Sequence, residues 1–288
     1  ASLDNLNSFS SKRISMTDSI KIKEKVKERY GKVALSGDSC CGPSVSIESG
    51  GGCCSGNSNT VLQSSLSAAQ VAELVGYDLN DLNSIPTTSI LGAGCGTPTK
   101  FAFIKEGNTV IDLGSGAGID VFLAANIVKG SGRVIGIDMT DEMLEKARKN
   151  AADNGYTNVE FRKGDVEERI PVEENSVDVV ISNCVINLTT DKVKTFREIY
   201  RILKPNGIGR MVISDLVTDK QIAEDISLID PEKWCSCIDG ALTKENYIGS
   251  IKNGGFDIVE VLDEKLYTEG DQVENRKITS LVIKAVKQ

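Results

Sequence analysis

The sequence predicts an α/β protein whose mostly parallel β-sheet carries helices on both faces. Short β-branched runs alternate with amphipathic segments of helical length from residue 109 onward. A glycine-rich turn follows the first of these runs, and a single carboxylate ends the second, as in nucleotide-binding βαβ units. The 288 residues suffice for one large α/β domain with an appendage, or for two modest domains.

The hydrophobic periodicity gives the expected order of elements. We expect helices at residues 17–34, 117–129, 140–154 and 190–203. We expect strands at residues 109–113, 133–138, 158–162, 176–182, 208–214, 256–264 and 279–286. Ser67 and Gln70 form a capping box before a further short helix, and residues 218–253 read as mostly helical. Residues 36–60 are dominated by glycine and serine, which predicts a mobile loop.

The composition and charge of the chain indicate which macromolecular partners it is unsuited to and in which compartment we expect it. The net charge of −8 and the pI near 4.9 argue against nucleic acid and against an anionic membrane. No stretch approaches the roughly 18 apolar residues of a membrane span, and no secretory leader is apparent. We therefore expect a cytoplasmic protein, and nothing in the sequence indicates an obligate oligomer, so a monomer is expected.

The glycine turn indicates the kind of cofactor. Gly114, Gly116 and Gly118 follow an apolar strand and open a helix, so a ligand can approach the backbone closely. Asp138 ends the next strand, where a carboxylate can accept both hydroxyls of a ribose. Asp112 would repel a pyrophosphate but suits a ligand with an ammonium group. The motif therefore favours S-adenosylmethionine over a nicotinamide dinucleotide.

The turn after the third strand is a second candidate cofactor contact. Gly164-Asp165-Val166-Glu167 could read an adenine edge through a carboxylate and a backbone N–H group. The alternative is a surface turn with a helix cap, which the predicted fold disfavours. Three further residues complete the predicted cofactor site: Ser115, Met139 and Asn183.

The chain has eight cysteines and no histidine. Structural disulfides are not expected in a cytosolic chain with a full core. The adjacent pairs and Cys235-x-Cys237 are too tight for the usual zinc spacing, and any single cysteine can be an inert buried residue. Cys184 follows a predicted strand, Cys95 lies in a glycine loop and Cys237 lies in the covering region. Three such thiols could meet above the cofactor and hold a thiophilic, three-coordinate centre.

Seven runs of the chain point to one family: GAGCGTP, DLGSGAGIDVFLAA, VIGIDMTDEMLEKAR, VEFRKGDVEERIP, DVVISNCVINL, RILKPNG and CIDGAL. Over about residues 20–260 the chain closely resembles the arsenite S-adenosylmethionine methyltransferases. The resemblance implies the class I methyltransferase fold, a doubly wound seven-stranded sheet with one antiparallel strand near the edge and a C-terminal arsenic-binding extension. It implies methylation of arsenite or its thiol conjugates, with a thiol reductant (thioredoxin or glutathione) completing the cycle.

The resemblance also assigns the cysteines. Cys95, Cys184 and Cys237 match the motif cysteines that hold trivalent arsenic. Cys40 and Cys41 look like the N-terminal redox motif of the family, and we group the second adjacent pair, Cys53 and Cys54, with them as a disulfide relay. Cys235 is an extra thiol beside Cys237, which leaves open which of the two binds arsenic.

The expected organisation has three parts. Residues 1–60 hold a helix and the cysteine-rich loop, residues 61–217 bind the cofactor, and residues 218–288 bind substrate and complete the sheet. Two other functions remain open. One is a class I methyltransferase acting on another small organic or metalloid substrate, and the other is a metalloid-binding protein without catalytic activity.

Overall fold

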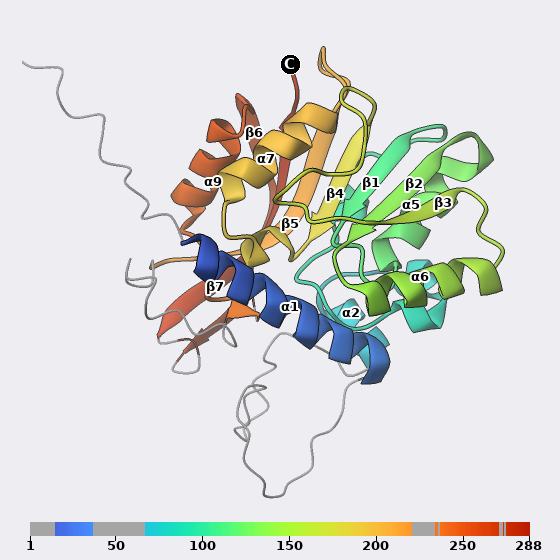
Figure 1. Cartoon of the computed structure of the whole chain (residues 1–288), viewed down its shortest axis with the longest axis horizontal. Coiled ribbons are helices and arrows are strands. Elements are labelled where there is room, and N and C mark those ends of the chain that lie inside the picture. Colours follow the sequence, from blue (N-terminus) through green and yellow to red (C-terminus); the bar gives the residue numbers. More distant parts are fainter. Residues whose placement is uncertain (1–14, 37–66, 221–233, 236, 271–272, 274) are drawn as a thin grey trace, which may run out of the picture.

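A seven-stranded sheet forms the centre of the protein in the computed structural model, with the strand order β3-β2-β1-β4-β5-β7-β6 (Figure 1). The structure describes residues 15–36, 67–220, 234–235, 237–270, 273 and 275–288. The strands are β1 (Thr109–Leu113), β2 (Arg133–Asp138), β3 (Val159–Lys163), β4 (Val179–Asn183), β5 (Arg210–Thr218), β6 (Ile258–Gly270) and β7 (Arg276–Val286). The first five pair in parallel, and β7 runs antiparallel to both β5 and β6. This confirms the prediction of one antiparallel strand next to the edge.

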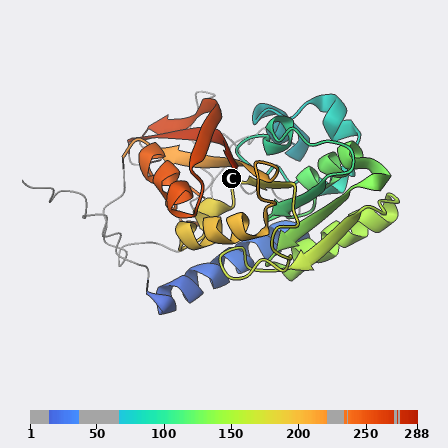
Figure 2. The ribbon, with the colours of Figure 1, turned by 90° about the horizontal axis from the view of Figure 1, so that it is seen from above.

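Helices cover both faces of the sheet, as predicted. The α-helices are α1 (Met16–Ser36), α2 (Ala68–Leu74), α3 (Leu79–Asn83), α4 (Pro98–Phe101), α5 (Ile119–Val128), α6 (Asp141–Asp153), α7 (Lys192–Ile202) and α9 (Lys244–Asn253). Three short 3-10 helices lie between these elements and the strands: η1 (Thr87–Ser89), η2 (Lys129–Ser131) and η3 (Ile186–Leu188). In Figure 2 the segment before β1, in teal, and α7, in yellow, lie on opposite sides of the sheet.

The alternation of side chains along each strand explains the two layers. In β1, Val110 packs into the cluster with α5 and α6, and its neighbour Ile111 packs into the cluster with α7 and α9. In β2, Val134 packs into the first of these clusters and Ile135 into the second. All four side chains are at most 1% exposed, so these strands are apolar on both faces, as buried parallel strands require.

Most predicted bounds are close to the observed ones, but β6 runs to Gly270 rather than to residue 264, and β7 begins at Arg276 rather than at residue 279. The fourth strand begins at Val179 rather than at residue 176, because Val177 forms only an isolated bridge with Leu203. Strand β5 extends to Thr218, since β7 pairs with it over its whole length. The prediction of mostly helical structure over residues 218–253 is wrong for residues 237–243, which form turns and a bridge before α9. Residues 221–233 of that range lie outside the described residues.

The strand order places a crevice between β1 and β4. The chain winds outward from β1 through β2 to β3, and in the other direction from β4 to β5. Ligands of open α/β sheets bind at such a switch point, beyond the carboxyl ends of the strands. Helix α1 crosses this end of the sheet in Figure 1. In the part of the chain that the structure describes, no helix has the length and apolar character needed to cross a membrane.

Candidate active site

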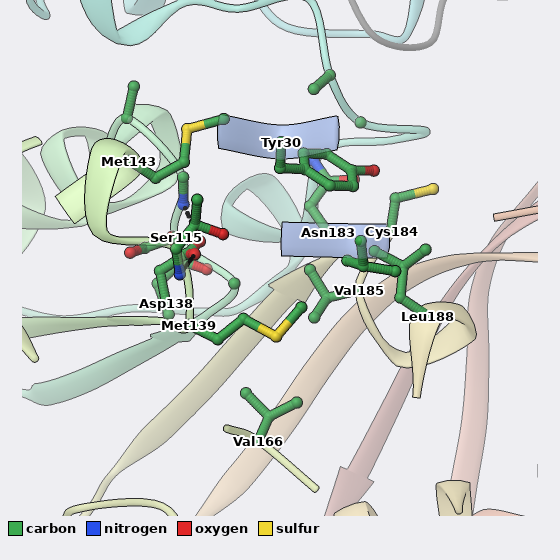
Figure 3. A pocket seen from close by; sticks show the side chains of 18 of the residues that line it. Tyr30, Ser115, Asp138, Met139, Met143, Val166, Asn183, Cys184, Val185 and Leu188 are labelled. Atoms are coloured by element: carbon green, nitrogen blue, oxygen red, sulfur yellow. Dashed lines mark hydrogen bonds between the residues drawn. The ribbon is translucent and has the colours of Figure 1, made fainter. Parts of the chain in front are cut away.

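A cavity lies at the carboxyl ends of β1, β2 and β4 and is closed on one side by α1. Figure 3 shows Ser115 and Asp138 on one side of it and Cys184 and Leu188 on the other, with Met139 between them. Every predicted cofactor residue except Gly118 lines this cavity: Asp112, Gly114, Ser115, Gly116, Asp138, Met139, Gly164, Asp165, Val166, Glu167 and Asn183. The predicted residues are therefore brought together from four separate turns.

The glycine turn takes its shape from left-handed backbone. Gly114, Gly116 and Gly118 have φ angles of 67°, 51° and 103°, a region that residues with a Cβ rarely adopt. The N–H of Gly114 donates to the Ile137 carbonyl at 2.7 Å, which ties the turn to β2. Gly118 begins α5 and does not line the cavity, so its contribution is conformational.

Backbone N–H groups hold the Asp138 carboxylate at the edge of the cavity. One oxygen accepts from the Gly116 N–H and the other from the Thr140 N–H, each at 2.9 Å. Burial raises the pKa of Asp138, and these hydrogen bonds oppose that shift. The Thr140 hydroxyl and the Met139 N–H also act on this carboxylate, which lines the cavity.

Two other buried carboxylates stand near Asp138. Burial raises the pKa of Asp112 well above its usual value, and the charges of Asp120 and Asp138 add to that shift. Asp120 accepts hydrogen bonds from Tyr77 and Thr99, whereas no donor among the described residues contacts the Asp112 carboxylate. A buried, unpaired carboxylate is costly unless a cation neutralises it. The cavity therefore favours a positively charged ligand group next to Asp112.

The two acids in the turn after β3, Asp165 and Glu167, already have partners within the protein, although the sequence suggested that they could contact the cofactor. Glu167 accepts from both the N–H and the hydroxyl of Thr190, at 2.8 and 2.6 Å. Asp165 accepts from the Glu167 N–H and lies 2.8 Å from the Lys23 ammonium. The side chain of Val166 points toward the cavity in Figure 3. Both acids hold neighbouring segments in place, and Val166 supplies an apolar surface.

Helix α1 is the part of the cavity that we did not predict as functional. Lys23, Val26 and Tyr30 line the cavity from this helix. The apolar spacing of residues 17–34 predicts a helix but indicates no functional role. The sequence signal for a functional role is that Lys23 and Tyr30 lie next to the apolar face of this helix. Both side chains combine an apolar body with a polar end, so they can cover a cavity that is partly polar.

The side chains of Cys95, Cys184 and Cys237 belong to one buried cluster beside the cavity. Among the described residues, the set of ligand atoms that all lie within 4.8 Å of one another is formed by Cys95, Cys184 and Asp215 and does not include Cys237. The Cys184 sulfur interacts with the sulfur atoms of both other residues. The Cys237 thiol also donates to the Cys184 carbonyl at a sulfur–oxygen distance of 3.1 Å. Cys184 lines the cofactor cavity as well, so it stands where the two sites join.

The backbone around two of these thiols is strained. Cys184 and Cys237 have φ angles of 59° and 64°, in the left-handed region. Such conformations cost on the order of 1 kcal/mol or more for a residue with a side chain, and they gather at functional sites. A 2.8 Å hydrogen bond from the Cys184 N–H to the Ser214 carbonyl of β5 holds the first of them. The surrounding sheet thus fixes a geometry that the local sequence would avoid.

Asn183 and Ser280 hold the loop that carries Cys95. The Asn183 amide accepts from the Cys95 N–H at 3.0 Å and donates to the Gly96 carbonyl at 2.7 Å. Ser280 of β7 donates to the Cys95 carbonyl at 2.6 Å. Asn183 lines the cavity, yet its amide hydrogen bonds serve mainly to position the thiol loop.

The surroundings of Cys184 do not favour its thiolate. The neighbouring Cys237 and Cys95 sulfurs, together with burial, raise the pKa of Cys184 well above its ordinary value. The Cys184 thiol therefore holds its proton more tightly than an exposed cysteine does.

Two charged residues beside the thiols were missed by the sequence analysis. One Asp215 oxygen lies within 4.8 Å of the Cys95 and Cys184 sulfurs, and burial raises the pKa of Asp215 to about 6. Lys192 is 8% exposed, and burial lowers its pKa to about 8. An isolated acid in the apolar run MVISDLV of a central strand is a signal that would have identified Asp215.

The structure separates Cys237 from Cys235. Cys237 joins the thiol cluster, whereas Cys235 packs with Ile22 and Val26 of α1 and with Trp234. Both cysteines are at most 1% exposed. The predicted relay cysteines, Cys40, Cys41, Cys53 and Cys54, lie outside the described residues.

Comparison with known proteins identifies the family. A model described as a methyltransferase domain matches residues 104–255. The crystal structure of an arsenic(III) S-adenosylmethionine methyltransferase from Chlamydomonas reinhardtii is 33% identical, with a TM-score of 0.60, and the match covers 75% of this chain and 72% of that one. The chain belongs to the arsenite methyltransferase family.

Two further relatives define how far this likeness extends. The arsenite methyltransferase of Halobacterium salinarum is 43% identical over 248 residues, which is 86% of this chain and 60% of that protein. The chain thus spans less than two thirds of this curated member of the arsenite methyltransferase family. A phosphoethanolamine N-methyltransferase from Haemonchus contortus, at 20% identity and a TM-score of 0.53 over 68% of this chain and 53% of that one, shares the fold alone.

Proposed function

We propose that this protein transfers a methyl group from S-adenosylmethionine to trivalent arsenic held by Cys95, Cys184 and Cys237. One observation carries the proposal: Cys184 borders the cofactor cavity and also belongs to the three-thiol cluster. A substrate bound to that sulfur would lie beside the cofactor. The position supports transfer between the two sites without a large movement of either.

The cavity fits the proposed cofactor on three points. Asp112 lacks a donor among the described residues and can pair with the ammonium of the methionine part. Asp138 lines the cavity at the end of β2, where its carboxylate can accept from the two ribose hydroxyls. The Ser115 hydroxyl is buried and has no hydrogen-bond partner among the described residues, which leaves it available to the ligand. S-adenosylmethionine supplies an electrophilic methyl group on a sulfonium centre.

The thiols capture arsenic by exchange for its oxygen ligands. In each exchange an As–S bond forms, an As–OH bond breaks, and the thiol proton leaves with the hydroxide as water. Because each proton leaves in this way, the raised pKa of Cys184 does not prevent capture. The bound arsenic keeps a lone pair, which attacks the methyl carbon and requires no general base. Holding the two partners at attack distance can contribute up to about 7–11 kcal/mol in the best cases.

We also propose that thiols return the arsenic to its trivalent state. Methyl transfer formally oxidises arsenic to the pentavalent state, and two thiols that close to a disulfide supply the two electrons that reduce it. A thioredoxin-like protein or glutathione would then reduce the disulfide. Cys40, Cys41, Cys53 and Cys54 remain our candidates for this relay, on the basis of the sequence alone.

Arsenic speciation by mass spectrometry tests the proposal. The purified protein is incubated with arsenite, S-adenosylmethionine and a thiol reductant, and each component is left out in turn. We expect methylated arsenic only in the complete mixture. Absence of methylated arsenic in a sample that binds the cofactor would contradict the proposal.

A further inference from the structure

A carboxylate shares the thiol cluster and has one acceptor position left. One Asp215 oxygen and the sulfurs of Cys95 and Cys184 all lie within 4.8 Å of one another, and all three residues are buried. Two backbone N–H groups and the Tyr247 hydroxyl donate to the carboxylate at 2.9 to 3.0 Å. A carboxylate offers about four acceptor positions, so one remains with respect to the described residues.

Capture of arsenite by two thiols leaves an As–OH group, which is a hydrogen-bond donor and needs an acceptor such as the Asp215 carboxylate. Arsenite that has exchanged two hydroxyls for thiolates still carries one hydroxyl. Both exchanges release water and leave the oxidation state of arsenic unchanged. The remaining As–OH group then lies in a buried site, where a hydrogen-bond donor without a partner is costly.

We propose that Asp215 accepts a hydrogen bond from the hydroxyl that arsenic retains while Cys95 and Cys184 hold it. Cys237 then displaces this hydroxyl, which leaves with the thiol proton as water, and the three-thiolate site is complete. The inference rests on the proposed function and adds an order of capture to it. It also makes the two-thiol stage selective for arsenic species that still carry a hydroxyl.

The competing explanation is that Asp215 only shapes the loop after Cys184. Its carboxylate accepts from the backbone N–H of Asn187 at 3.0 Å, and such a role would support every arsenical equally. Methylarsonous acid separates the two explanations. It has two exchangeable hydroxyls, so none remains once Cys95 and Cys184 have reacted, whereas arsenite keeps one.

The experiment uses the full chain with Cys237→Ala, which stops capture at the two-thiol stage. Binding of arsenite and of methylarsonous acid is followed by the fluorescence of Trp234, the single tryptophan of the chain. Adding Asp215→Asn should weaken arsenite binding at least about tenfold, the lower range for a hydrogen bond to a charged group. Binding of methylarsonous acid should change less than about twofold, because no hydroxyl remains to be held.

Tyr247→Phe is the matched control, because it removes one partner of the carboxylate but keeps the carboxylate itself. It should affect both arsenicals equally. An equal loss of both in Asp215→Asn, or no loss of either, overturns the inference, as does a Cys237→Ala protein that binds only methylarsonous acid. Circular dichroism checks folding, and Asp215→Ser replaces Asp215→Asn if the latter does not fold. A wild-type protein that binds neither arsenical would instead refute the proposed function.

Discussion

The cofactor side and the thiol side of the candidate site are built by the chain in different ways. On the cofactor side, the continuous segment Asp112–Gly118 forms the glycine turn that lines the cavity, and the end of the next strand contributes Asp138. On the thiol side, Cys95, Cys184 and Cys237 come from three remote segments. The first is a local structure held by glycine conformations. The second exists only when the whole sheet is assembled.

This difference explains what holds each region. The glycine turn closes on its own neighbour β2 through the hydrogen bond from the Gly114 N–H to Ile137. The thiol cluster depends on anchors from other strands, with Asn183 of β4 and Ser280 of β7 fixing the Cys95 loop. Changes on the two sides should therefore have separable effects, and the following predictions test that separation.

The largest effect is expected from Cys184→Ser. Serine cannot form the As–S bond, and Cys184 is the sulfur that joins the cluster to the cavity. We expect methylation of arsenic to fall on the order of a hundredfold or more, as for a misplaced reacting partner. Cofactor affinity, measured by equilibrium dialysis with labelled S-adenosylmethionine, should change less than about twofold, because no charged contact is lost.

Cys235→Ser is the matched control for this experiment. Cys235 is buried to the same degree as Cys237 but packs against α1, away from the thiol cluster. Methylation by Cys235→Ser should remain within a few-fold of the wild type. Comparable losses in both variants would show that the loss reflects folding rather than arsenic binding.

The next effect is expected from Asp138→Ala, on the other side. The substitution removes the acceptors for the ribose hydroxyls and leaves the Gly116 and Thr140 N–H groups without their partner. We expect cofactor affinity to fall at least about tenfold, because hydrogen bonds to a charged group are lost. Arsenite binding in the absence of cofactor should be unchanged. An unaltered dissociation constant for S-adenosylmethionine would remove Asp138 from the ribose site.

The same contrast shows what could be predicted from the sequence. The strands, the glycine turn and Asp138 follow from patterns within a few residues, and the structure places them as expected. The meeting of Cys95, Cys184 and Cys237 was expected because Cys184 follows a predicted strand, because a loop and the covering region carry the other two, and because the chain resembles a family. No local pattern states that these thiols are adjacent.

The residues that were missed have a common physical reason. Asp215 and Lys192 matter because of side chains that pack on them from other elements, and a strand or helix pattern does not report such neighbours. Tyr30 reaches the cavity only because α1 crosses the strand ends. The role of Asn183 in holding the Cys95 loop likewise depends on a contact between segments 88 residues apart.

A smaller effect, shared by both sides, is expected from Gly114→Ala. A Cβ on Gly114 would overlap the side chain of Val185, which follows Cys184, and the φ angle of 67° is unfavourable for alanine. We expect a loss of about 1–3 kcal/mol in the free energy of unfolding, measured in urea. Adding Val185→Ala should recover only the part of the loss caused by the overlap, because the backbone strain remains. A full recovery would mean that the φ angle costs nothing here.

The smallest effect is expected from Lys192→Met and depends on pH. Lys192 is buried and interacts with Asp215 on the thiol side and with Glu167 on the cofactor side, so it belongs to both regions. Burial lowers its folded-state pKa to about 8, below the value of 10.5 expected in the unfolded chain. The folded state therefore binds this proton less readily than the unfolded state does. The associated stability is present above pH 10.5 and is lost as the pH falls through 8.

Methionine removes that penalty while keeping most of the side-chain volume. At pH 7 we expect Lys192→Met to raise the free energy of unfolding by about 1 kcal/mol, because relief of desolvation exceeds the loss of attraction to Asp215 and Glu167. The gain should shrink as the pH approaches 10. Lys149→Met, at a position whose side chain is 75% exposed, is the control and should give no such dependence on pH. A loss of stability in Lys192→Met at pH 7, in place of the expected gain, would show that the two acidic neighbours stabilise Lys192 more than burial penalises it. The cofactor and thiol sides would then be linked by an ion pair rather than separated.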